Sequence, residues 1–151
     1  MTTTFIAGAE RADRAVASTR RTVLLIAAGI AVAGAATSAV ALTVTALGAA
    51  DGFAPLRPAL YLPFVAIGVI AAVIGWRLIR SRAANPVAVL RVLVPVVLLA
   101  SFIPDAILIV TRFIPGTTLV GGLSLSAMHI IVAAVAVPLA QRIAPVGTPR
   151  R

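Results

Sequence analysis

Four long, mostly apolar stretches dominate this chain of 151 residues. A helix rises about 1.5 Å per residue and the hydrocarbon of a bilayer is about 30 Å thick, so about 20 apolar residues cross it. Lipid offers no partners to backbone amides, so we expect each stretch to be a helix despite its Val and Ile content. The stretches cover approximately residues 23–47, 60–76, 87–110 and 119–140.

The sequence therefore predicts an all-α fold, a four-helix transmembrane bundle. Its 61% apolar and 11% charged residues lie outside the range of soluble domains. We expect one membrane domain at 22–143, between a basic N-terminal segment at 1–21 and a tail at 144–151. The first apolar stretch is longer than the core of a signal peptide, about 7–15 residues, so we expect it to be retained. Asn85 followed by Pro86 is typical of an N-cap and first helical residue.

Arginine distribution predicts the orientation. Eleven of the thirteen arginines lie in the first 21 residues, between Arg77 and Arg91, or in the last ten residues. Only Arg57 and Arg112 lie in the other two connections. Cytoplasmic loops carry the excess of positive charge, which predicts a multi-pass protein of the bacterial plasma membrane with both termini cytoplasmic. This placement also explains the net charge of +9 without nucleic acid as a partner.

Two aromatic side chains mark the ends of the second stretch. Tyr61 lies at its outer end and Trp76 at its inner end. Tyr and Trp are enriched where helices meet the lipid headgroups. We therefore expect both side chains to belong to interfacial belts.

Asp105 is the acidic residue within an apolar stretch, and His129 is the single histidine. Ionisable groups are costly in hydrocarbon, so they should face the bundle interior or water. Asp105 lies seven residues before Arg112 and His129 eight after Gly121, which places both roughly 10–12 Å from the outer surface. A short loop makes the third and fourth helices antiparallel neighbours. We expect Asp105 and His129 to be in contact, directly or through water, as candidate catalytic residues.

Hydroxyl side chains occupy the same outer half of the predicted bundle and favour a polar pocket there. Two interpretations stay open. The hydroxyls line a ligand or proton site, or they bond their own backbone while an Asp–His contact locks two helices together. In the second case Arg112 is a further candidate partner for Asp105. The candidate pocket residues are Ser38, Thr43, Thr45, Ser101 and Ser126.

Several classes of chemistry lack the residues that they need. The chain has no Cys, which excludes disulfides, thiolate metal sites and cysteine nucleophiles. Asp105 and His129 alone supply two metal ligands, fewer than zinc normally has, so no metal site is predicted. A single embedded acid excludes a glycosidase carboxylate pair. No phosphate-binding glycine motif occurs, and no cofactor is indicated.

Short motifs are distributed across residues 20–143, namely Pro55-Leu56, Tyr61-Leu62-Pro63, Trp76-Arg77, Ser101-Phe102-Ile103-Pro104-Asp105 and Met128-His129. This set resembles an uncharacterised family of small four-helix integral membrane proteins found mainly in actinobacteria. This resemblance implies the four-span topology and draws attention to Asp105 and His129 as the polar members of the pattern. It implies no particular activity.

Three functions are compatible with this pattern. The first is an integral plasma-membrane protein with a structural, accessory or small-ligand-binding role. The second is a membrane-embedded enzyme in which Asp105 orients His129 for proton transfer on a lipid or isoprenoid substrate. The third is a proton-linked carrier, for which four helices suffice only in an oligomer. The lipid bilayer is the predicted partner, and a homo-oligomer or a membrane-protein partner stays open.

Overall fold

Four α-helices form the protein, and they confirm the predicted all-α four-helix bundle. The computed structural model describes the backbone of residues 2–147 and the side chains of residues 18–147. This part of the chain contains no strand. The predicted terminal segments 1–21 and 144–151 lie outside the described side chains except at 18–21 and 144–147. The elements are α1 (Thr2–Ala46), the 3₁₀ helix η1 (Ala54–Leu56), α2 (Pro58–Arg82), α3 (Pro86–Thr111) and α4 (Leu119–Ile143).

All four helices are long and apolar enough to cross a membrane. Within the part of α1 whose side chains are described, the candidate span covers Ser18–Ala46, which is 29 residues, and the other three helices have 25 or 26. At about 1.5 Å per residue the shorter ones reach roughly 38 Å, more than the hydrocarbon thickness. Many of their large apolar side chains are exposed on the bundle, among them Val110, Leu42 and Phe64. In water this would be unfavourable, so the chain is built as a multi-pass membrane protein.

Side-chain caps set the starts of α3 and α4. Asn85 Oδ1 accepts a hydrogen bond of 3.1 Å from the Ala88 amide, and Pro86 opens α3, as predicted. Thr118 Oγ1 accepts one of 2.9 Å from the Gly121 amide at the start of α4. These bonds satisfy amides that have no partner within a helix.

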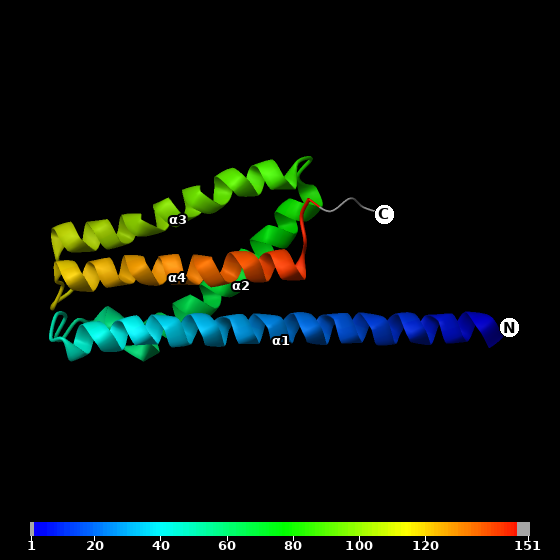
Figure 1. Cartoon of the computed structure of the whole chain (residues 1–151), viewed down its shortest axis with the longest axis horizontal. Helices are drawn as coiled ribbons and strands as arrows, with labels where there is room; N and C mark the ends of the chain where they lie inside the picture. Colours follow the sequence, from blue (N-terminus) through cyan, green and yellow to red (C-terminus); the bar gives the residue numbers. More distant parts are fainter. Residues whose placement is uncertain (1, 148–151) are drawn as a thin grey trace.

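Consecutive helices run antiparallel, so the chain enters the apolar part of α1 and leaves α4 at the same end of the bundle (Figure 1). α4 packs against each of the other three helices. α2 lies obliquely to them in this view. The core between the helices includes Val69 and Ala33, which are fully buried, and Ala136 and Ala140 on α4.

Glycines allow close approach between some helices. A Cβ at Gly68 would lie 3.3 Å from Val132 on α4, and one at Gly122 would overlap Ile109 on α3. Small residues have this role at many membrane helix interfaces. Gly75 does not, since nothing lies within 4 Å of the position of its Cβ.

The two loops at the far end from the termini are tied together. Thr118 Oγ1 donates a hydrogen bond of 2.8 Å to the Ala49 carbonyl. Gly116 has φ +78°, and a Cβ there would lie 2.9 Å from backbone atoms of Gly52 and Phe53. Only glycine adopts this conformation and tolerates this contact without strain. The loop after α1 and the loop after α3 therefore form one connected end, the loop end.

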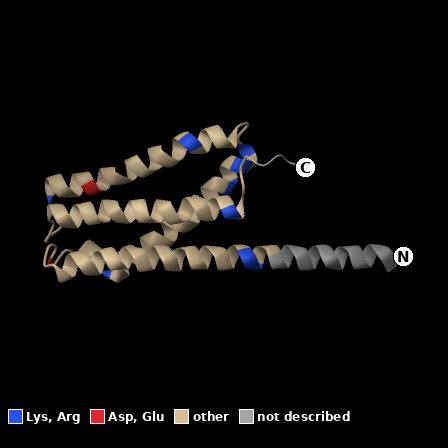
Figure 2. Cartoon of the chain, in the orientation of Figure 1, with Lys and Arg blue, Asp and Glu red and all other residues tan. Residues whose placement is uncertain are grey.

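The arginines are distributed unequally between the two ends of the bundle. Figure 2 shows that most of them gather at the end opposite the loop end. Arg57 and Arg112 lie at the loop end, beside η1 and after α3. We call the opposite end the basic end; its described arginines are Arg20, Arg21, Arg77, Arg80, Arg82, Arg91 and Arg142.

The expectation that Tyr61 and Trp76 form interfacial belts is wrong. Both side chains are buried, with 7% and 8% exposed. Tyr61 Oη donates a hydrogen bond of 2.8 Å to Ser38 Oγ on α1. Trp76 Nε1 donates one of 2.9 Å to the Ala144 carbonyl after α4. The rings thus face the protein instead of the headgroups. Each polar atom has a protein partner, as a buried Tyr or Trp requires.

Candidate functional site

Asp105, Ser126 and His129 meet between α3 and α4. Ser126 Oγ donates a hydrogen bond of 2.9 Å to Asp105 Oδ2. His129 Nε2 lies 3.5 Å from the same oxygen, longer than a usual N–H···O hydrogen bond. Ser126 and His129 are three residues apart and therefore share one face of α4. The predicted Asp105–His129 contact is thus direct, and we call these three residues the polar cluster.

The polar cluster is buried at one side and open at the other. The Asp105 side chain is 7% exposed, whereas that of His129 is 42% exposed. Phe102, one helical turn before Asp105, contacts the imidazole edge-on with ring centroids 6.3 Å apart. A buried carboxylate needs polar partners, and α4 supplies two of them to Asp105 Oδ2. The imidazole connects this carboxylate to the surface of the bundle.

Arg112 does not share this arrangement. Among the described side chains, no ion pair joins it to Asp105. Arg112 follows the last residue of α3 in a left-handed conformation, with φ 51°, and its amide donates to the Leu108 carbonyl. The cationic group nearest to the Asp105 carboxylate is therefore His129 when its imidazole is protonated.

The other predicted pocket residues form separate bonds. Ser101 Oγ donates to the Leu98 carbonyl at 2.6 Å, and Thr45 and Thr43 bond the Ala41 and Ala39 carbonyls, all within their own helices. Ser38 instead accepts the bond from Tyr61. Of the predicted hydroxyls, the structure brings Ser126 alone into hydrogen-bonding contact with Asp105.

Besides the Trp76–Ala144 bond, two hydrogen bonds between separate segments of the chain were not predicted. Tyr61 pairs with Ser38, and Thr118 caps α4 while it bonds the loop after α1. A signal for the second was present, because a threonine directly before an apolar stretch is a typical N-cap. For Tyr61 the sequence carried no such signal, since the bond depends on how α1 and α2 face each other.

The groups of the polar cluster are suited to proton transfer and hydrogen bonding. A carboxylate beside an imidazole orients the ring and stabilises its charge when it takes a proton. Asp105 and His129 would supply two ligands to a metal ion, and no group of three potential ligands occurs within the described side chains. Ser126 bonds Asp105 instead of His129, so it is not activated as a nucleophile by the imidazole.

Comparisons of this chain with protein-family models, with curated proteins and with solved structures give no match. The resemblance to the actinobacterial family stays a prediction. The function of the site is therefore inferred from its geometry.

Proposed function

We propose that this protein is a structural or accessory unit of the bacterial plasma membrane, with both termini in the cytoplasm. The orientation is supported by the arginines at the basic end, since positive charge is retained on the cytoplasmic side. The polar cluster then lies in the outer half of the membrane. In this proposal its role is to hold α3 against α4.

One observation carries the proposed structural role. The Asp105 carboxylate is buried, and its Oδ2 is met by two side chains of a single neighbouring helix, Ser126 and His129. In lipid, such a group is stabilised only while the two helices stay paired. Hydrogen bonds between membrane helices contribute about 0.6 kcal/mol on average and up to about 1.7 kcal/mol. The polar cluster thus selects one rotation and depth of α4 against α3.

The test compares stability with chemistry in the same variants. Ser126→Ala and His129→Ala should each lower the free energy of unfolding in detergent, Ser126→Ala by about 0.6–1.7 kcal/mol. Ser101→Ala is the matched control, because that hydroxyl lies one turn from Asp105 but bonds its own helix. Asp105→Asn keeps an acceptor for Ser126 and removes the charge. The lipid extract of cells that carry any of these variants should be unchanged.

A second candidate function rests on the exposure of His129. Its imidazole is 42% exposed while it contacts a buried carboxylate, so it is placed to exchange a proton with a substrate in the membrane. This arrangement supports an enzyme that acts on a lipid or isoprenoid. If His129→Ala alters the lipid extract and leaves the melting temperature unchanged, the structural proposal fails and the enzymatic one replaces it.

A further inference from the structure

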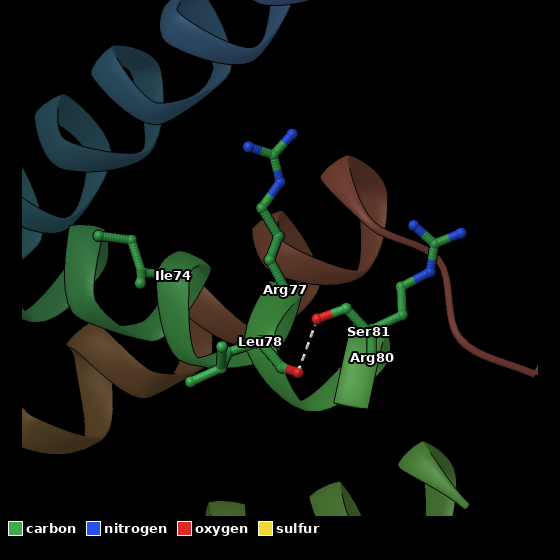
Figure 3. A pocket seen from close by; sticks show the side chains of 5 residues that line it. All are labelled: Ile74, Arg77, Leu78, Arg80 and Ser81. Carbon is green, nitrogen blue, oxygen red and sulfur yellow. Dashed lines mark hydrogen bonds between the residues drawn. The ribbon is translucent and has the colours of Figure 1, made fainter. Parts of the chain in front are cut away.

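A shallow hollow of about 700 Å³ lies along α2 at the basic end. It is lined by Ile74, Arg77, Leu78, Arg80 and Ser81. Figure 3 shows that both guanidinium groups stand out from the helix, while Ile74 and Leu78 lie on the side toward the middle of α2. The hollow thus has an apolar part within the predicted membrane and a cationic part at its boundary.

The two arginines of the hollow lack an acidic partner among the described side chains. The acids in this part of the chain are Asp51, in the turn after α1, and Asp105, in the last third of α3. Both belong to the half of the bundle that contains the loop end (Figure 2). Arg77 and Arg80 are three residues apart, so they share a face of α2. Their positive charge is therefore available to an external anion.

The apolar part of the hollow is also uncovered. Ile74 is 60% exposed and Leu78 is 46% exposed. Ser81 Oγ donates to the Leu78 carbonyl at 2.9 Å, so it does not project toward these side chains as a donor. A ligand that fits must carry an apolar portion beside Ile74 and Leu78 as well as negative charge beside the arginines.

A second hollow of about 460 Å³ adjoins the first and shares Arg80 and Ser81 with it. Its other walls are the turn between α2 and α3 and the segment Pro145–Gly147 after α4. The two hollows together pass from apolar side chains, through the arginines, to the turns beyond the helix ends. This order matches acyl chain, phosphate and headgroup in a phospholipid.

We propose that the basic end binds an anionic phospholipid in this hollow. The phosphate lies between Arg77 and Arg80, the upper acyl chains lie along Ile74 and Leu78, and the rest of the headgroup occupies the adjoining hollow. Guanidinium groups present forked donors that match phosphate oxygens, and basic pockets of this kind at the cytoplasmic side suit anionic headgroups. The site is independent of the role proposed for the polar cluster.

Lipid titration of the full-length chain in detergent tests the proposal. The single tryptophan, Trp76, directly precedes Arg77, so phosphatidylglycerol with brominated acyl chains should quench its fluorescence on binding. Brominated phosphatidylcholine is the comparison lipid. A basic residue near an anionic surface contributes about five-fold in affinity, so two give roughly thirty-fold. We expect phosphatidylglycerol to bind roughly thirty-fold more tightly than phosphatidylcholine. Equal binding of the two lipids would overturn the proposal.

A pair of matched variants separates this hollow from general positive charge. Arg77→Gln with Arg80→Gln should weaken phosphatidylglycerol binding roughly thirty-fold. Arg91→Gln with Arg142→Gln removes the same charge from the basic end but outside the hollow. Its loss of affinity for phosphatidylglycerol should be several-fold smaller than that of the first double variant. Equal losses in the two double variants would overturn the proposal. Melting temperatures without lipid should match the parent, because the arginines of the hollow are exposed and have no described acidic partner.

Soluble competitors identify the source of the phosphate. Glycerol phosphate has the anionic group without acyl chains, so it should displace the brominated lipid only at a concentration at least about ten-fold higher, as expected when apolar contacts contribute. Displacement at equal concentration would assign the hollow to a soluble phosphate ligand and overturn the lipid proposal. Ile74→Ser should weaken lipid binding without changing glycerol phosphate binding. If the protein is a dimer and no brominated lipid quenches Trp76, the hollow is covered by a second copy of the chain. This result would also overturn the lipid proposal.

Discussion

Replacement of Gly122 by alanine should force α3 and α4 apart. The new Cβ would overlap Ile109 Cγ1 and lie 2.7 Å from Ile109 Cδ1. A β-branched residue has one strongly preferred χ1 rotamer in a helix, so Ile109 cannot rotate away without cost. Overpacking costs about 1–3 kcal/mol, whereas alanine gains at most about 1 kcal/mol in helix propensity over glycine. With that gain subtracted, the free energy of unfolding should fall by up to about 2 kcal/mol.

Thermal unfolding in detergent measures this loss. Trp76 is buried and hydrogen-bonded to the Ala144 carbonyl, so its fluorescence reports the folded bundle. For a chain of this size, 1 kcal/mol corresponds to roughly 2–4 °C, so Gly122→Ala should lower the Tm by up to roughly 8 °C. Gly75→Ala is the matched control, because it makes the same change in open space. Ile109→Ala should restore part of the loss in the Gly122→Ala background.

The double variant supplies the strictest test. Residues in contact show coupling energies of about 0.5–3 kcal/mol, whereas the effects of independent residues add. If Gly122→Ala costs no more than Gly75→Ala, the close approach of α3 and α4 at this position is refuted. The same holds if the effects of Gly122→Ala and Ile109→Ala are additive.

Thr118→Val should destabilise the bundle by about 1–2 kcal/mol in the same assay, since it removes the cap of the Gly121 amide and the bond to the Ala49 carbonyl; an unchanged Tm would contradict the role of this side chain at the loop end. The proposed orientation is tested by single cysteines in this cysteine-free chain. A membrane-impermeant maleimide should label Asp51→Cys on intact cells, and Ala84→Cys, in the turn between α2 and α3, only after permeabilisation. The reverse pattern would refute cytoplasmic termini.

The helical fold could be predicted because the lipid hydrocarbon around the apolar stretches restricts the backbone structures that are stable there. A stretch long enough to cross the hydrocarbon has to satisfy its own amides, and this condition leaves helices as the solution for separate apolar stretches. The start of α3 was also predictable, since Asn85 and Pro86 act through local chemistry. The helices continue beyond the predicted stretches, with α2 reaching Arg82. Arginine is a good helix former, so a helix can continue through arginines beyond its apolar part. A prediction based on hydrophobicity alone ends with the apolar part.

The contact between Asp105 and His129 could be predicted, because the depth of each residue in the membrane follows from its distance along the chain to the end of its helix. Asp105 and His129 lie at similar distances from the loop between their helices. In the structure, His129 Nε2 lies 3.5 Å from Asp105 Oδ2. The rotation of each helix about its own axis was not predictable, because it is set by packing against neighbours. For that reason the expected belt position of Tyr61 was wrong, and its bond to Ser38 was missed.

The packing of α4 against all three other helices has a consequence for biosynthesis. Membrane spans leave the translocon in chain order, so α4 enters the bilayer after α3. Until then Asp105 resides in the bilayer without Ser126 and His129, the side chains that meet its carboxylate. Nascent chains that end before Leu119 therefore lack the two side chains that meet the Asp105 carboxylate, and the cost of placing this group in lipid is not yet offset.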